Sequence, residues 1–301
     1  MRAAWLYYAG GCTQAEVAER LGVSKLKAHR LITRANRDGI VKVHIDGDIA
    51  ECVQFEQQLS ERFNLAYCEV VPDFDHDELP LKSLGPAGGQ YLHRLLDGTK
   101  VKSVGIGHGR TMAACVENIP RTRNCNVEFV SLLGGFSRKF AANPHDVIHR
   151  LAERTNAQSY VLPVPFAADT IKDKDILMGQ SGIQKVMELA RSSPLKVAGV
   201  GDLQMTSTLL VTEMVSGSDM ENVIKAGGAG ELLGNFFAED GSTVNTTLSR
   251  RTIGLSVDDI KGSQVVGIAG GPAKSKAIKA VLNSGLLSGL ITDERTARSL
   301  I

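Results

Sequence analysis

The chain has 301 residues, of which 43% are hydrophobic, with 34 basic and 33 acidic side chains and a formal net charge of +1. This length fits a small module plus one larger domain, and the hydrophobic content is ample for a folded core, which excludes a disordered protein. No apolar run approaches the roughly 20 residues of a transmembrane helix, and no basic stretch followed by an apolar one opens the chain. We therefore expect a cytoplasmic protein without a membrane partner.

The five cysteines are odd in number and scattered along the chain, at Cys12, Cys52, Cys68, Cys115 and Cys125. They form no Cys-x-x-Cys pair and no cluster with histidine at the spacing of metal ligands. We predict buried thiols in a reducing cytosol, with neither a metal nor a cofactor.

Two short helices are predicted near the start of the chain. Thr13 and Glu16 form a capping box that begins a helix at Gln14, and a glycine ends this helix after two turns. Ser24 caps a second helix, which continues to the polar segment 36–39. Two short helices joined by a three-residue turn predict a helix-turn-helix, whose second helix lies in a DNA major groove.

Charge distinguishes this interpretation from an ordinary helical hairpin. Residues 1–43 carry eight basic and three acidic side chains, a net charge of +5, which leaves −4 for the rest of the chain. A basic module on an acidic body is typical of a nucleic-acid-binding domain attached to a domain with another role. The alternative is a small solvated helical subdomain. The expected phosphate contacts are Lys25, Lys27, Arg34 and Arg37, the expected base contacts are Ser24, Lys25, Lys27, Ala28, His29 and Arg30, and further DNA contacts are expected from Thr13 and Gln14.

Other elements are expected around these helices. A first helix over residues 3–9 should bury Trp5 beneath them. The alternation over residues 40–45 predicts a short strand, which would form a wing beside the DNA. We therefore place a DNA-binding domain at residues 1–47 and a larger domain at residues 51–301.

The larger domain begins with a helix whose Phe55, Leu59 and Phe63 share one face. A strand at residues 66–71 and a helix at residues 83–96 follow, separated by an acidic loop. Four apolar strands that each end in glycine then lie at residues 101–109, 127–135, 196–202 and 264–271. Because such strands need both faces covered, they predict an α/β fold with a mainly parallel sheet and a ligand site beyond the carboxyl ends of the strands.

An anion site is predicted where the first of these strands ends, at Gly107, His108, Gly109, Arg110 and Thr111. Glycines at a strand-to-helix junction let backbone N–H groups approach an anion, and the helix N-terminus adds the positive end of its dipole. The pattern is neither the dinucleotide-binding GxGxxG nor the P-loop, which disfavours a nucleotide ligand. The alternative is that the glycines serve only as tight turns.

Further candidates each have a structural alternative. Asp202 follows an apolar strand and could bind sugar hydroxyls or cap a helix. His108 could contact a ligand or carry a proton, although a single loop histidine often does neither. The glycines at 270–271 offer a second opening with Lys274 as a point charge. Residues 227–231 form either a ligand-facing loop or a flexible turn.

These motifs occur in the order of a known family. The chain resembles the SorC/DeoR-type sugar-responsive bacterial transcriptional regulators in its helix-turn-helix and in the segments GIGHGRT, SLLGG, LPVPF, GVGDL, GAGELLGNFF, RTIGLSVDDIK, VVGIAGGPAKSKAI and GLLSGLITDERTA. The resemblance implies an α/β effector domain similar to sugar-phosphate isomerases but without their activity, which binds a phosphorylated sugar or polyol and forms a dimer or tetramer on DNA. The effector-binding residues that it implies are Gly107, His108, Gly109, Arg110, Thr111, Gly134, Gly135, Asp202, Gly270, Gly271 and Lys274.

The sequence departs from the family pattern at two places. Many relatives have an aromatic residue where His108 stands, and the recognition helix reads SKLKAHRL where relatives often have a proline and a Val-Ser pair. Within the family, the chain resembles regulators of polyol catabolism, among them regulators of erythritol catabolism.

The expected function is repression of a carbohydrate or polyol catabolic operon, with double-stranded operator DNA and a phosphorylated sugar or polyol as partners. The alternative is a sugar-phosphate isomerase or deaminase with a fused DNA-binding domain. Such an enzyme needs positioned acid and base groups, but the candidates Asp202, His108 and Glu231 lie at separate junctions of the chain.

Overall fold

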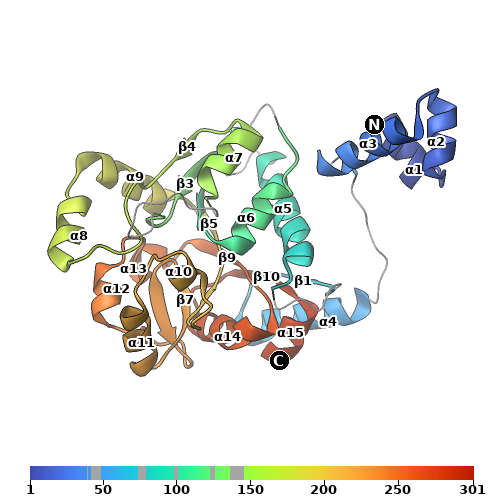
Figure 1. The fold of residues 1–301 in the computed structure, drawn as a ribbon. Helices are drawn as coiled ribbons and strands as arrows, with labels where there is room; N and C mark the ends of the chain where they lie inside the picture. The colour runs from blue at the N-terminus through green and yellow to red at the C-terminus, as the bar shows by residue number, and fades with distance from the viewer. Residues whose placement is uncertain (39, 42–48, 74–78, 98–100, 123–125, 136–145) are drawn as a thin grey trace.

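The computed structural model describes residues 1–38, 40–41, 49–73, 79–97, 101–122, 126–135 and 146–301. Figure 1 shows a small group of helices formed by the first residues of the chain and a larger α/β body. In none of these ranges is there a helix with the length and apolar character needed to cross a bilayer.

The N-terminal group consists of three helices, α1 (Arg2–Tyr8), α2 (Gln14–Leu21) and α3 (Lys25–Arg37). The predicted capping box is present, because Thr13 Oγ1 accepts the Glu16 N–H and the Glu16 carboxylate accepts the Thr13 N–H. Gly22 adopts a left-handed conformation at the end of α2, which turns the chain into α3. The predicted helix-turn-helix is therefore confirmed.

Two expectations for this group need comment. The prediction that Trp5 is buried is wrong: its side chain is 65% exposed, because α1 turns Ala3 and Leu6 toward the other two helices instead. The predicted wing strand falls mostly on residues 42–45, which lie outside the described residues. Ile40 and Val41 belong to no helix or strand.

The body contains a seven-stranded sheet whose paired strands are all parallel. In spatial order its strands are β1 (Tyr67–Val71), β10 (Gly289–Asp293), β9 (Gln264–Ile268), β5 (Leu195–Ala198), β2 (Ser103–Ile106), β3 (Glu128–Ser131) and β4 (Ser159–Tyr160). The four glycine-ended strands predicted from the sequence are β2, β3, β5 and β9, and they lie side by side. The prediction of a mainly parallel α/β sheet is confirmed.

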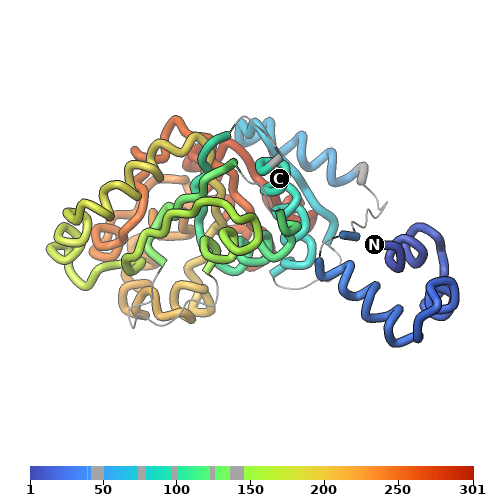
Figure 2. Tube along the Cα trace, turned by 90° about the horizontal axis from the view of Figure 1, so that it is seen from above, coloured from blue at the N-terminus to red at the C-terminus, as the bar shows by residue number. Residues whose placement is uncertain are grey.

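Both faces of this sheet are buried, which explains why its strands are apolar throughout. On β10, Leu290 packs into one core and its neighbour Ile291 into the other, and Val265 and Val266 of β9 divide in the same way. One face is covered by α5 (Leu81–Asp97), α6 (Arg110–Glu117) and α7 (Ile148–Thr155). The other face packs against α4 (Ile49–Phe63), α9 (Ser181–Ser192), α14 (Ser275–Asn283) and α15 (Glu294–Leu300) (Figures 1 and 2).

A second, antiparallel sheet of three strands follows the central strand β5 along the chain. Its strands are β6 (Gly201–Asp202), β7 (Gly228–Leu232) and β8 (Asn235–Ala238). The glycine-rich segment 227–231 is therefore neither of the two expected loops, because most of it pairs with β6 and β8 as a strand. The remaining helices are α8 (Ile171–Met178), α10 (Thr208–Val211), α11 (Gly217–Lys225), α12 (Thr247–Arg251), α13 (Val257–Ile260) and the 3₁₀ helix η1 (Pro272–Lys274).

The cysteines follow the expected burial in part. Cys12, Cys52 and Cys115 are buried and Cys68 is half-buried, and none of these four forms a disulfide. The thiol pKa of Cys115 is raised to about 12, because burial disfavours the thiolate. Cys125 lies outside the described residues.

Candidate functional site

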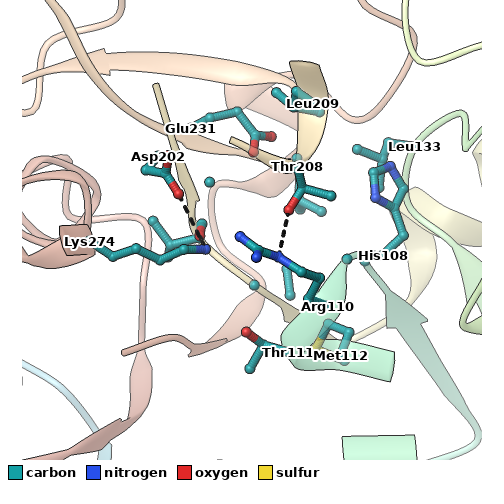
Figure 3. Close-up of a pocket in the computed structure, with 17 residues that line it drawn as sticks. His108, Arg110, Thr111, Met112, Leu133, Asp202, Thr208, Leu209, Glu231 and Lys274 are labelled. Atoms are coloured by element: carbon teal, nitrogen blue, oxygen red, sulfur yellow. Dashed lines mark hydrogen bonds and ion pairs between the residues drawn. The ribbon is translucent and has the colours of Figure 1, made fainter. Parts of the chain in front are cut away.

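A cavity of about 60 Å³ lies beyond the carboxyl ends of β2 and β5, the two strands at the centre of the large sheet. Figure 3 shows the side chains that line it. They come from the β2–α6 turn, the β3 end, the β5–β6 segment, α10, β7 and η1, and are Gly107, His108, Gly109, Arg110, Thr111, Met112, Leu133, Ala198, Gly199, Val200, Gly201, Asp202, Thr208, Leu209, Glu231, Leu233 and Lys274.

The turn from β2 to α6 brings a helix N-terminus to this cavity. The Gly107 N–H donates to the Val197 carbonyl at 2.8 Å, which continues the pairing of β2 with β5 up to the cavity edge. Gly109 has φ +118°, a conformation that strains any residue with a side chain. The helix α6 begins immediately afterwards, and no side chain caps its first N–H groups. Such a terminus is an anion-binding feature.

Two cationic side chains meet in the cavity. Arg110 Nε donates to Thr208 Oγ1 at 3.1 Å, so α10 fixes the guanidinium. Lys274 Nζ donates to the Val200 carbonyl at 2.8 Å and lies 3.8 Å from Asp202 Oδ2. Figure 3 shows Arg110 and Lys274 pointing toward one another. The cavity therefore concentrates positive charge beside the N-terminus of α6.

Two carboxyl groups lie next to these cations. The Glu231 side chain is 7% exposed, and its Oε1 accepts the Gly234 N–H at 2.5 Å. Burial raises the pKa of Glu231 to about 7, against the opposing effects of the Gly234 hydrogen bond and of Lys274. Burial also lowers the pKa of Lys274, although Asp202 favours its charged form. A ligand in this cavity therefore meets cations and hydrogen-bonding carboxyl groups together.

His108 separates this cavity from a second one. Its ring contacts Phe166 edge-on, with centroids 6.2 Å apart. The second cavity has a volume of about 260 Å³ and a mainly apolar lining from β2, β3 and the α7 region. Gly107, His108 and Leu133 line both cavities, whereas Gly135 lines only the second.

The helix α3 presents a basic surface at the other end of the chain. Its exposed cationic side chains are Lys25, Lys27, Arg30, Arg34 and Arg37, and His29 is also exposed. A surface hollow is lined by His29, Arg30, Thr33, Arg34 and Arg37. Arg34 and Arg37 share Asp38 as an acidic partner, at 3.3 and 3.9 Å, so the cations of this surface outnumber its acids. This surface suits a polyanion.

Comparison with known proteins assigns the family. The profile of the Sugar-bind family of sugar-binding domains matches residues 47–301. The chain belongs to the Sugar-bind family. It is 47% identical over 301 residues to the erythritol catabolism regulatory protein EryD of Brucella abortus, covering 100% of this chain and 95% of that protein. It is 29% identical to the transcriptional regulator LsrR of Klebsiella pneumoniae, covering 100% and 91% of the two chains.

Solved structures give the same assignment for this Sugar-bind protein. The full-length sorbitol operon regulator SorC from Klebsiella pneumoniae matches with a TM-score of 0.74 and 25% identity, covering 99% of this chain and 96% of that one. A DeoR family transcriptional regulator from Listeria monocytogenes matches with a TM-score of 0.75 and 26% identity, covering 83% and 99%. The predicted resemblance to SorC/DeoR-type regulators is confirmed. The protein is a transcriptional regulator, and the enzyme alternative is not supported.

The structure of this Sugar-bind regulator brings together seven of the eleven predicted effector residues. Around the first cavity lie Gly107, His108, Gly109, Arg110, Thr111, Asp202 and Lys274. These residues come from three segments of the chain that meet where β2, β5 and β9 end. Their role in binding stays a prediction.

The other predicted glycines do not line this cavity. Gly135 lines the second cavity, and packing explains Gly134, Gly270 and Gly271. An added Cβ at Gly134 would meet the Pro165 carbonyl oxygen at 2.2 Å, and one at Gly270 would meet Asp293 Oδ2 at 2.1 Å. The Gly271 N–H donates to Asp293 Oδ2 at 2.9 Å and to Thr296 Oγ1 at 2.8 Å. The expected second anion opening at Gly270 and Gly271 is therefore closed by α15.

Several cavity residues escaped the sequence analysis. Thr208 and Leu209 lie in no motif, and Leu233 lies in the segment GAGELLGNFF without a predicted role; only the fold brings these residues to the end of β2. The sequence indicates Glu231 only as a candidate acid of the enzyme alternative and does not predict that it lines the effector cavity. The glycine at 201 leaves room for the Glu231 carboxyl group, because an added Cβ there would meet Glu231 Oε2 at 2.3 Å.

One predicted DNA contact is contradicted. Ala28 is fully buried against α1 and α2, because it lies on the inner face of α3 with Ile32 and Ala35. Thr13 and Ser24 are exposed, but their hydroxyl groups cap α2 and α3. The remaining candidates on α3 are exposed and stay predictions, as does the half-buried Gln14.

Proposed function

We propose that this protein represses a carbohydrate or polyol catabolic operon and that a sugar or polyol effector controls its binding to DNA. Residues 1–47 bind the double-stranded operator through α2 and α3, and residues 51–301 bind the effector and form the oligomer. The basic surface of α3 and the relatives' roles in erythritol catabolism and in a sorbitol operon support this division. The protein works in the cytoplasm. It acts as a dimer or tetramer, because one DNA-binding module on one half-site of the operator binds too weakly for selective repression.

The effector is phosphorylated in this proposal. The observation that carries it is the convergence of Arg110 and Lys274 beside the uncapped N-terminus of α6. A helix N-terminus and a guanidinium are both favourable partners of a phosphate dianion. Asp202 and Glu231 then accept or share hydrogen bonds with ligand hydroxyl groups. A free sugar would offer Arg110 and Lys274 no anionic group beyond the Asp202 carboxylate that already lies 3.8 Å from Lys274.

A short polyol phosphate is the ligand class that this proposal favours. The 47% identical relative is named for erythritol catabolism. The ligand acts by favouring one quaternary arrangement over another, and it changes DNA affinity only through its different affinities for the two arrangements.

A thermal-shift screen tests the proposal. The panel contains erythritol, sorbitol, their monophosphates and inorganic phosphate, and operator binding is then measured with each compound that stabilises the protein. A ligand at 100 times its Kd adds about 2.7 kcal/mol, which raises the melting temperature by roughly 5 °C or more for a domain of this size. Stabilisation by the phosphorylated compounds alone is expected. Equal stabilisation by the free polyols would contradict a phosphorylated effector.

A further inference from the structure

The exposed face of α3 carries an apolar side chain among its cations. Successive residues of a helix are rotated by about 100°, so the face opposite the buried Ala28 and Ile32 carries Leu26, Arg30 and Thr33. Leu26 is 63% exposed. Ala28 and Ile32 pack in one core with residues of α1 and α2, so the opposite face of α3 is directed away from those helices.

A single exposed leucine is ordinary on a protein surface, but the position of Leu26 is not arbitrary. It is the second residue of α3, and the first turn of a recognition helix contacts base edges in the major groove. Lys25 and Lys27 are exposed on either side of it, and Arg30 lies one turn further along the same face. The positive charge of this surface favours a polyanion such as DNA as its partner. The flanking cationic side chains then contact the phosphates, and Leu26 faces the base edges in the major groove.

The major groove offers one apolar feature, the C5 methyl group of thymine, and guanine offers the pair of acceptors that suits an arginine. We propose that Leu26 recognises a thymine by packing on its methyl group and that Arg30 recognises a guanine in the same half-site. Leu26 and Arg30 are about 6 Å apart along the helix axis. Since base pairs are spaced by about 3.4 Å, the two bases lie within about two base pairs of one another. This inference rests on the proposed binding of DNA through α2 and α3.

The test begins with an operator selected from random duplex DNA by the full-length protein. Each thymine of the selected half-site is then replaced by uracil, which removes only the methyl group. At one of these thymines, replacement by uracil should weaken binding of the protein to the duplex by about fourfold for each half-site changed. This is the effect expected from the loss of one buried methyl group. The Leu26→Ala variant should bind the thymine and uracil duplexes equally. The matched variant Arg30→Ala should keep the preference for thymine and lose the preference for guanine.

A second variant keeps the test informative if Leu26→Ala folds poorly. Leu26→Gln should prefer adenine where the wild type prefers thymine. The glutamine amide can donate a hydrogen bond to the adenine edge and accept one from it. A selected operator in which no thymine responds to uracil, or a Leu26→Ala variant that still prefers thymine, contradicts this inference alone. A selection that enriches no sequence contradicts the proposed DNA binding and this inference with it.

Discussion

The predicted effector residues divide into a set that lines the cavity, which includes Arg110 and Lys274, and glycines such as Gly270 and Gly271 that serve the packing of the chain. Arg110 and Lys274 could be assigned from the sequence because each follows a glycine-ended strand. In the sequence, Gly270 and Gly271 predict an anion site in the same way as Gly107 and Gly109. The sequence does not show that Asp293, more than twenty residues further on, accepts the hydrogen bond of the Gly271 N–H. Thr208 could not be found, since its contact with Arg110 spans 98 residues.

Lys274→Met should weaken effector binding and spare DNA binding. The substitution removes one of the two cavity cations, and a lost charge-assisted contact weakens a phosphate ligand by roughly 10- to 100-fold. Isothermal titration with the best phosphorylated polyol measures the affinity, and an electrophoretic shift measures operator binding without effector. The matched control is Lys276→Met, two residues away, where the side chain is exposed and pairs with Glu239 on the surface. Equal losses in both variants would mean that Lys274 does not contact the ligand.

Glu231 should make the stability of the protein depend on pH. Burial raises the pKa of Glu231 to about 7 from an ordinary value of 4.5. The protonated carboxyl group therefore contributes fully to the stability of the folded state below pH 4.5. This contribution is lost as pH rises through about 7, because the buried group must then ionise. Between pH 5 and 8 the wild type should lose about 2.5 kcal/mol more of its free energy of unfolding than Glu231→Gln, which keeps an acceptor for the Gly234 N–H. Urea unfolding at several pH values measures this difference. Glu239→Gln, at an exposed surface carboxylate, should leave the pH dependence unchanged.

Among the elements, most helices and strands could be predicted because their signals are local. The capping residues Thr13 and Ser24 and the apolar runs of β2, β3, β5 and β9 lie within the elements that they specify. The helix α5 is different, since it contains Pro86 and glycines at 85, 88 and 89. Those glycines are explained only by α6, which packs directly on them.

Gly88→Ala should destabilise the contact between α5 and α6. The added Cβ would meet Cys115 Sγ at 2.3 Å and Ile268 Cδ1 at 2.9 Å. Overpacking of this kind costs about 1–3 kcal/mol, which thermal and urea unfolding detect. Gly182→Ala in α9 is the matched control, because nothing lies within 4 Å of its added Cβ. It should preserve stability or raise it by up to about 1 kcal/mol. Destabilisation of both variants alike would contradict a specific role of the α5–α6 contact.

Across the whole molecule, the proposed DNA and effector surfaces belong to elements with separate hydrophobic cores. The core that contains Val17 and Ile32 shares no residue with the two cores of the body. The charge asymmetry of the sequence predicts a basic DNA-binding module separate from a larger body. The sequence does not show which helices cover each face of the sheet, because that depends on the order of the strands.

Arg37→Ala should weaken DNA binding without changing sequence preference. Its guanidinium is exposed at the last residue of α3, where a phosphate contact releases a counterion. The slope of log affinity against log salt should fall in magnitude by about 1 for each bound copy, while ligand-induced stabilisation stays unchanged. Operator titrations at several salt concentrations measure the slope. Lys225→Ala, at an exposed lysine of α11 that pairs with Glu221, should leave the slope as it is.

The hydrogen bonds from the Gly271 amide to Asp293 and Thr296 mean that the last helix braces the turn that carries Lys274. A gene that acquires a stop codon at or before codon 293 would lose both acceptors and leave that buried amide unsatisfied. The three helices at the opposite end of the chain would keep their own core. Under the proposed division of roles, such an allele would produce a protein that still occupies its operator and no longer senses its inducing metabolite.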